Sequence, residues 1–277
     1  MNDRVQPQRR ACAVSVIGGP TTVIDVGGLR IVVDPTFDEP GPKGPGGYLT
    51  KLTGPAASPS DLGAVDVVLV SHDQHPDNLD VSGREFALVA PLLLTGPASA
   101  GRLGPAATGL SPWSTYRLPR PDGNGELQIT AVPAVHGPED GEKDDDGHVN
   151  CEVIGFVLSG RALPTVYVSG DNASMRVVGE ISRKIGRIDV AVLFMGAARV
   201  PAKNEGRPLT LTSERGSAAA AILDASSVIP AHCDGWAHFT EGHAEITRAF
   251  NDAGLLAVLA DAAPGEWIPL TNLPIAV

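Results

Sequence analysis

Short runs of apolar, β-branched residues recur along the chain, and Gly, Pro or Asp stands at their ends. Runs of this length with such boundaries are typical of buried strands. The first three runs are joined by short Gly-containing turns, which indicates antiparallel hairpins. The segments expected to contain strands are CAVSVIG (12–18), TTVIDVGG (21–28), LRIVVDP (29–35), DVVLVSH (66–72), ALVAPLLLTG (87–96), LQITAVPAVHG (127–137), EVIGFVLSG (152–160), PTVYVSGD (164–171), DVAVLFMG (189–196) and SVIPAHC (227–233).

Helical patterns are fewer and lie late in the chain, at 172–186, 211–225 and 240–254. Each has a Ser/Thr start, an Ala-rich body or a Gly stop. Strands in excess, with helices between the later ones, predict a layered α/β protein. We expect a flexible N-terminal tail at 1–10 and a single domain at 11–277.

Two loops interrupt this pattern. Residues 35–63 are rich in Pro and Gly and longer than a connector needs, so they predict either a lid or rim over a site or a solvated insertion. Residues 137–150 are acidic, which is typical of a solvated surface loop, although they directly follow a candidate ligand.

Composition narrows the function classes. The formal net charge of −11 disfavours nucleic acid and anionic membranes as partners, and no apolar run is long enough to span a bilayer. The first ten residues lack an apolar signal core, so we expect a cytoplasmic protein. Three cysteines without a CxxC pair predict neither a disulfide framework nor a thiolate zinc site, and each is read as a small apolar residue.

Four potential ligands stand at the ends of predicted strands: His72, His136, Asp171 and His232. A single histidine after a strand is usually a turn residue. Four such residues would cluster if their strands share a sheet edge, where α/β folds place their sites. Histidine and aspartate are the ligands that Zn²⁺ and related divalent ions prefer, so the pattern predicts a metal centre.

The segments SHDQHPDNLD (71–80), AVHGPE, VYVSGDNAS and PAHCDGWAHF, with VIGGPTTVIDVGGLRIVVDPTF near the start, resemble metallo-β-lactamase fold hydrolases. Within that family the likeness is to the UlaG-like branch, which includes an ascorbate-6-phosphate lactonase. The resemblance implies an αββα sandwich with one or two metal ions at the sheet edge. The family motif reads H-x-H-x-D-H, whereas this chain has two residues between its histidines and Asn78 in place of the last one.

By this resemblance, His72, His75 and His136 would bind a first ion, Asp77 and His232 a second, and Asp171 would bridge them. Asn78 or Asp80 would act as a ligand or support one. Zinc is the expected ion, with Mn or Fe as alternatives.

The expected chemistry is hydrolysis of a small ester, lactone or phosphoester by metal-activated water, with Asp77 as the catalytic residue. Trp236, His238 and Tyr48 are candidate pocket residues, although Trp236 also fits simple packing and His238 an exposed position. His148 and His243 are expected to face solvent.

Three other functions stay open: a non-catalytic relative with a degraded site, a mononuclear iron oxidoreductase on the same fold, and a thiol nucleophile at Cys233. The expected partner is a small molecule. Homo-oligomerisation also stays open.

Overall fold

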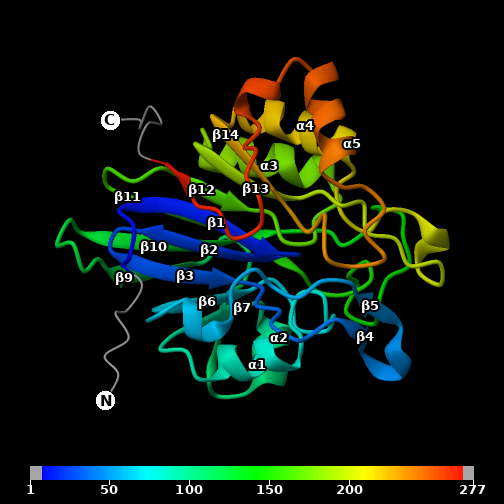
Figure 1. Ribbon diagram of the computed structural model, residues 1–277, viewed down its shortest axis with the longest axis horizontal. Coiled ribbons are helices and arrows are strands. Elements are labelled where there is room, and N and C mark those ends of the chain that lie inside the picture. The colour runs from blue at the N-terminus through cyan, green and yellow to red at the C-terminus, as the bar shows by residue number, and fades with distance from the viewer. Residues whose placement is uncertain (1–7, 271–277) are drawn as a thin grey trace.

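Two β-sheets pack face to face, with helices on the outer side of each, in the computed structural model of the protein, which describes residues 8–270 (Figure 1). The strands are β1 (Cys12–Gly18), β2 (Thr21–Val26), β3 (Leu29–Val33), β4 (Gly41–Lys43), β5 (Leu49–Lys51), β6 (Val67–Val70), β7 (Leu93–Thr95), β8 (Ala107–Gly109), β9 (Thr115–Pro119), β10 (Glu126–Pro133), β11 (Ile154–Gly160), β12 (Val166–Val168), β13 (Val190–Phe194), β14 (Ser227–Ala231) and β15 (Ile268–Pro269). The α-helices are α1 (Val81–Leu88), α2 (Pro97–Leu103), α3 (Met175–Ile185), α4 (Ser213–Leu223) and α5 (His243–Asp252).

Each of the two large sheets combines antiparallel and parallel pairing. In the first, with order β15-β1-β2-β3-β6-β7-β8, strands β1 to β3 are antiparallel as predicted, and β3, β6, β7 and β8 run parallel. In the second, with order β14-β13-β12-β11-β10-β9, the parallel strands are β12 to β14. Parallel neighbours end at the same sheet edge, which brings the residues that follow them together.

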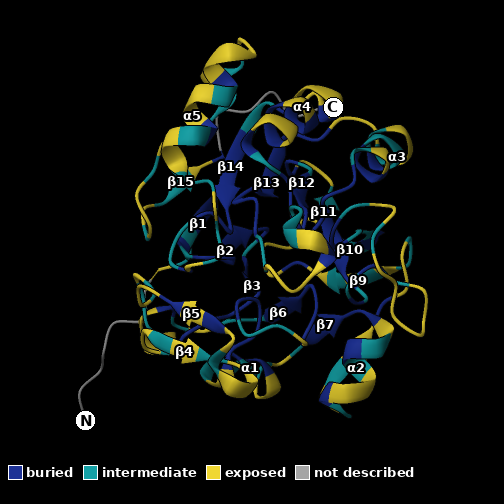
Figure 2. Cartoon of the chain, turned by 90° about the vertical axis from the view of Figure 1, so that its right-hand side faces the viewer, coloured by how far each residue is buried: buried dark blue, intermediate teal, exposed yellow. Residues whose placement is uncertain are grey.

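Three hydrophobic cores hold the layers together. The largest lies between the sheets, where Ile31 of the first sheet and Phe156 of the second are fully buried. A second fills the space under α3, α4 and α5, and a third lies under α1 and α2. Figure 2 shows buried strands between helices whose outer faces are exposed. The predicted αββα sandwich is therefore confirmed.

The three predicted helices are present as α3, α4 and α5, each inside its expected range. Their starts follow the expected capping chemistry: Ser174 accepts from the Val177 amide and Thr212 from the Arg215 amide. The pattern missed α1 and α2. The run at 87–96 was wrongly assigned as one strand, because Ala87 and Leu88 end helix α1 and only Leu93–Thr95 forms β7.

Most of the predicted tail at 1–10 lies outside the described residues. Within the described part, Arg9 pairs with Asp66 at 3.0 Å, and the Arg10 amide donates to Asp25 Oδ2 at 2.7 Å.

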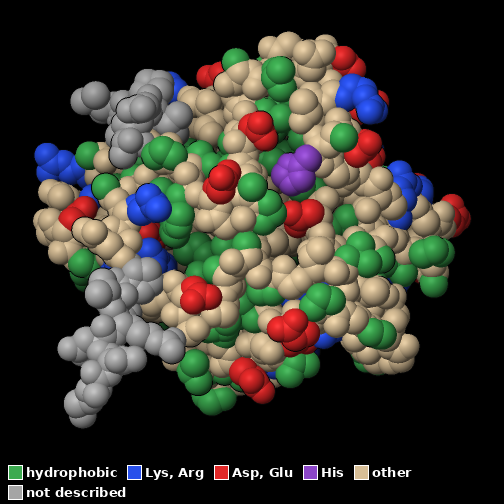
Figure 3. Space-filling model, viewed as in Figure 1, with side chains coloured by type: hydrophobic (Ala, Val, Ile, Leu, Met, Phe, Trp, Pro, Cys, Tyr) green, Lys and Arg blue, Asp and Glu red, His purple; other side chains and the backbone are tan. Residues whose placement is uncertain are grey.

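On the face shown in Figure 3, acidic side chains are spread out, while Lys and Arg lie toward the margins. Across residues 8–270, no helix has the length and apolar character needed to cross a membrane.

Candidate metal centre

Four sheet strands deliver the residues of the candidate site. His72 lies two positions beyond β6, His136 three beyond β10, Asp171 three beyond β12 and His232 one beyond β14. The bodies of β6, β12 and β14 are buried almost throughout and that of β10 is partly buried, and each strand fixes the direction of its end, so the polar residues that follow meet between the sheets. The structure brings them together in two adjoining groups.

The first group contains three histidines and a cysteine. His72 Nε2 lies 2.8 Å from His75 Nδ1, which lies 3.2 Å from His136 Nε2. Cys151 Sγ joins them, and one donor atom from each of the four residues lies within 4.8 Å of all the others. The sequence pattern did not predict that Cys151 lies among these histidines, because no second cysteine lies near it in the sequence.

These imidazoles are held neutral and oriented. Burial lowers the pKa of His72 well below its usual value and lowers those of His75 and His136 to about 4. His136 Nδ1 lies 3.0 Å from the Leu209 carbonyl and therefore donates to it, which leaves the Nε2 lone pair for the group. Neutral imidazoles with converging lone pairs are a donor set for a transition-metal ion.

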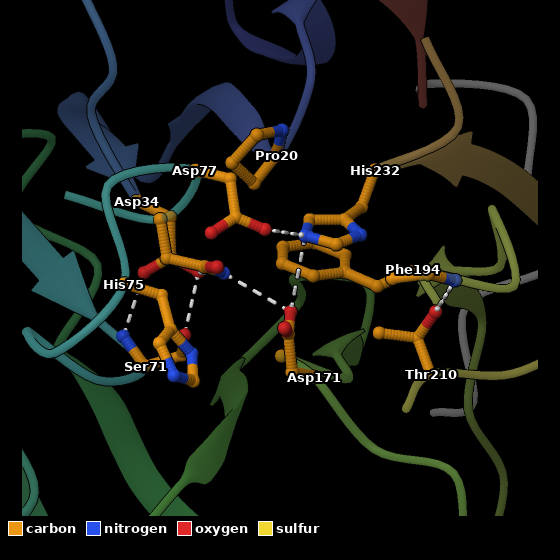
Figure 4. A network of polar contacts seen from close by, with 12 residues as sticks. Pro20, Asp34, Ser71, His75, Asp77, Asp171, Phe194, Thr210 and His232 are labelled. Carbon is orange, nitrogen blue, oxygen red and sulfur yellow. Dashed lines mark hydrogen bonds and ion pairs between the residues drawn. The ribbon is translucent and has the colours of Figure 1, made fainter. Parts of the chain in front are cut away.

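The second group contains Asp77, Asp171 and His232. His232 Nε2 lies 3.2 Å from Asp77 Oδ2 and 3.4 Å from Asp171 Oδ1, as Figure 4 shows, and its ring stacks on Phe194. Asp171 Oδ2 lies 3.5 Å from His136 Nε2, so Asp171 connects the two groups. The bridging role expected of Asp171 stays a prediction.

The charges of the second group depend on each other. Burial opposes ionisation of Asp77, but His238 and His232 together lower its pKa well below the usual value. Burial raises the pKa of Asp171. Burial also disfavours a charged His232, yet the neighbouring carboxylates of Asp171 and Asp77 outweigh it and raise the His232 pKa.

Asn78 joins two buried carboxylates. Its Nδ2 donates to Asp171 Oδ1 at 3.0 Å and to Asp34 Oδ2 at 3.2 Å. Asp34 also accepts from the Ser71 amide at 2.6 Å and from the Ser71 hydroxyl at 2.7 Å, and that hydroxyl lies 3.0 Å from His72 Nδ1. Asp34 was not predicted, although it directly follows β3 as the other site residues follow their strands.

Asp80 does not join the centre, and its expected role there is wrong. Its carboxylate caps helix α1 by accepting from the Gly83 amide at 2.8 Å, and it accepts from the amides of Phe37 and Asp38. It also pairs with Lys51 at 3.0 Å, with both side chains buried. These partners occupy the carboxylate and turn it away from the histidines.

A cavity of about 180 Å³ opens above both groups. Tyr48 and His238 line it, and His238 Nε2 lies 2.9 Å from Asp77 Oδ2. Their role as substrate-pocket residues stays a prediction. Trp236 does not line it, because its ring is buried against Gly19 and the Lys51 ammonium. The full lining is Tyr48, Leu49, His75, Asp77, His136, Asn150, Asp171, Ala198, Val200, Ala202, Lys203, Leu209 and His238.

Both long loops contribute to this cavity. The loop at 35–63 carries the β4–β5 hairpin and supplies Tyr48 and Leu49, as expected of a rim, and the acidic loop supplies Asn150. His148, expected to face solvent, is only partly exposed, with 41% of its side chain accessible.

Cys233 has no activated setting. Burial raises the pKa of its thiol, and its Sγ lies 3.8 Å from His243 Nε2. A reactive thiol needs a lowered pKa, so the geometry does not favour a Cys233 nucleophile.

Unpartnered buried atoms test whether a metal ion fits. Asp77 Oδ1 and Asp171 Oδ2 are buried without a hydrogen-bond partner, and buried carboxylate oxygens are normally satisfied. His75 Nδ1 also lies within hydrogen-bond distance of His72 Nε2 and His136 Nε2. In neutral rings these three nitrogens carry too few protons for all of them to form hydrogen bonds with one another. A bound cation accounts for both features, so the residues fit a divalent ion.

Comparison with known proteins agrees with the fold. Residues 29–233 match the family described as Beta-lactamase superfamily domain. A UPF0173 metal-dependent hydrolase from Anaeromyxobacter dehalogenans (strain 2CP-C) is 27% identical over 176 residues, which is 61% of this chain and 59% of the relative's length. The chain thus spans about three fifths of that relative.

Solved structures share the architecture across nearly the whole chain. Isothiocyanate hydrolase from Delia radicum gut bacteria superposes with a TM-score of 0.77 at 19% identity, covering 93% of this chain and 98% of that one. A possible metal-dependent hydrolase from Veillonella parvula DSM 2008 has a TM-score of 0.77 at 14% identity, covering 94% and 100%. Because the family match covers most of the chain and the sandwich is the same, the protein belongs to the beta-lactamase superfamily.

Proposed function

We propose that the protein is a metal-dependent hydrolase that acts on a small, largely apolar ester or lactone. The observation that carries this proposal is the placement of two metal-type donor groups at the floor of one small cavity. Asp171 connects the groups, and both contribute residues to the cavity lining. The metal-dependent hydrolases among its relatives support the same class of reaction.

We assign the ligands expected from the sequence to the two groups. His72, His75 and His136 would hold one ion, and Asp77 and His232 another, with Asp171 between them. A bound divalent ion supplies a Lewis acid and lowers the pKa of water from about 15.7 towards about 7. We propose zinc, because imidazole and carboxylate donors suit it.

Asp77 would orient the attacking water. Its pKa is low, so the carboxylate is ionised at neutral pH and accepts hydrogen bonds. His238 donates from Nε2 to Oδ2 at 2.9 Å, while Oδ1 has no hydrogen-bond partner among the described residues and is available to the bound ion or to its water. His238 lines the same cavity, and its Nε2–H on Asp77 Oδ2 fixes the orientation of this carboxylate toward the cavity.

The cavity walls favour an uncharged substrate. Leu49, Val200, Leu209 and two alanines form most of the surface, and Lys203 is the only cationic side chain among the lining residues. About 180 Å³ is below the roughly 300–1,000 Å³ of drug-sized pockets, so the substrate is small. These features favour an ester or lactone over a multiply charged phosphoester. They also fit a small isothiocyanate, the substrate class named for one structural neighbour.

The test combines metal analysis with a substrate panel. Purified protein is assayed for metal content and for turnover of small aryl esters, lactones, isothiocyanates and a phosphodiester. We expect up to two ions per chain and turnover of an uncharged substrate. His136→Ala should lose both bound metal and activity, whereas His148→Ala, at a partly exposed histidine of the acidic loop outside the cavity lining, should keep both.

Three outcomes would contradict the proposal. Unchanged metal content in His136→Ala would refute the site. Absence of metal after loading would favour a non-catalytic relative, and iron with oxidative but no hydrolytic turnover would favour an oxidoreductase.

A further inference from the structure

The surroundings of Cys151 differ from those of the other two cysteines. Cys233 packs in the hydrophobic core under α3 to α5, and Cys12 packs against the core between the sheets. Cys151 is 3% exposed, yet it belongs to none of the hydrophobic cores formed by the described residues. Its sulfur lies among histidine nitrogens. Simple apolar packing therefore does not explain its position.

The backbone around Cys151 holds the thiol at this place. Asn150 has a left-handed φ of 64°, and the Cys151 amide donates to the Val149 carbonyl at 2.8 Å, which turns the chain sharply. The Ile154 amide donates to the Ser71 carbonyl at 3.2 Å, beside His72.

The next residue anchors the same segment on another side. Glu152 accepts from the Ala98 amide at the start of α2 at 2.8 Å. With anchors on both sides, the sulfur is directed to the histidines by fixed backbone rather than by a loose loop.

We propose that Cys151 is the fourth ligand of the ion held by His72, His75 and His136. This inference rests on the proposed metal centre and extends it. The donor atoms of the four residues lie within 4.8 Å of one another, and three nitrogens with one thiolate sulfur complete a tetrahedral zinc set. Four protein ligands close the first site.

Among the residues that the structure describes, the second group supplies three protein donors, from Asp77, Asp171 and His232. Structural zinc sites are closed by four protein ligands, whereas catalytic sites keep a position open. The first ion would therefore be tightly held and organise the centre, and the second site would provide the open position below the cavity. The two sites should differ in affinity and in resistance to chelators.

Cobalt substitution tests the sulfur ligand directly. The protein is stripped with a chelator and reloaded with Co²⁺, and its near-ultraviolet absorption is recorded for a thiolate-to-cobalt charge-transfer band. The band should appear in the wild-type protein and remain in the Cys12→Ser/Cys233→Ser double variant, where Cys151 is the remaining cysteine. It should vanish in Cys151→Ser. The dissociation constant of the tighter ion should rise by more than the roughly 10–100-fold caused by loss of an outer-shell partner.

The outcomes separate this inference from the proposed function. Failure of the wild-type protein to bind cobalt would refute the metal centre itself. Bound cobalt without the band, or a band that survives Cys151→Ser, would overturn the sulfur ligand and leave the metal centre standing.

Alkylation provides a measurement that does not need Cys151→Ser to fold. In the double variant, iodoacetamide labelling of Cys151 should be blocked by the bound ion and restored by a chelator. Equal labelling with and without the ion would overturn the inference.

Discussion

Replacing Asn78 with alanine tests whether its amide holds the centre together. Asn78 stands where the family motif has a histidine, yet its Nδ2 donates to the buried carboxylates of Asp34 and Asp171. The substitution removes both hydrogen bonds. A hydrogen bond to a charged group contributes about 1.5–3 kcal/mol. Each acceptor keeps another neighbour, since Asp34 Oδ2 retains the Ser71 hydroxyl and Asp171 Oδ1 lies 3.4 Å from His232 Nε2.

The lower end of that range therefore applies to each bond, and the expected loss is about 3 kcal/mol in the free energy of unfolding. For a chain of this size, that corresponds to a fall in Tm of roughly 6–12 °C. Urea unfolding of metal-free protein, followed by circular dichroism, measures the change. Metal affinity should also fall by roughly 10–100-fold, because Asn78 positions a predicted ligand.

The loss should depend on pH. Burial raises the pKa of Asp34 to about 7, while the Ser71 and Asn78 hydrogen bonds oppose this rise. The folded pKa exceeds the unfolded one, so the contribution of Asp34 to stability is fully present below pH 4 and is lost as the pH rises through about 7. The Asn78 amide stabilises the ionised form, so Asn78→Ala should cost more at pH 8 than at pH 5.5.

Asn78→Asp is the matched control, because it keeps the size of the side chain but replaces the donor with a third carboxylate. It should destabilise more than Asn78→Ala at pH 8 and recover at low pH, where a protonated carboxyl can donate. A loss below about 1 kcal/mol for Asn78→Ala, with unchanged metal affinity, would refute the assigned role, since two bonds to charged groups contribute more than that.

Two further predictions concern helix packing and acid stability of the centre. Gly83→Ala should strongly destabilise the fold, because a Cβ there would lie 1.8 Å from the Pro35 carbonyl oxygen. Gly101→Ala, where a Cβ would meet open space, should instead stabilise helix α2 by about 0.5–1 kcal/mol. Thermal unfolding of both variants measures these changes. Since His75 and His136 have pKa values of about 4, protons should compete with the ion held by the first group only as the pH approaches 4. Substantial release of that tighter ion at pH 6 in equilibrium dialysis would contradict this.

The predicted lid segment and the candidate pocket residues show what the sequence pattern could not predict, namely which neighbours each side chain contacts. Tyr48 and His238 line the cavity, but Trp236 is packed and Asp80 caps a helix. The sequence named all four as candidates for the site, three for the pocket and Asp80 for the metal centre. Their actual roles depend on which neighbours the fold supplies, such as Lys51, whose side chain lies against both Trp236 and Asp80.

The sequence by itself determined the layered sandwich and the strand-end residues of the centre. Buried strands can be recognised from apolar runs in the sequence, and each strand fixes the direction of the residue that follows it. His72, Asp171 and His232 could therefore be expected to converge. Only the tertiary structure decided the place of Cys151 and the contacts of Asn78. Both depend on chain segments far apart in sequence, which hydrogen bonds such as that from the Ile154 amide to the Ser71 carbonyl bring together.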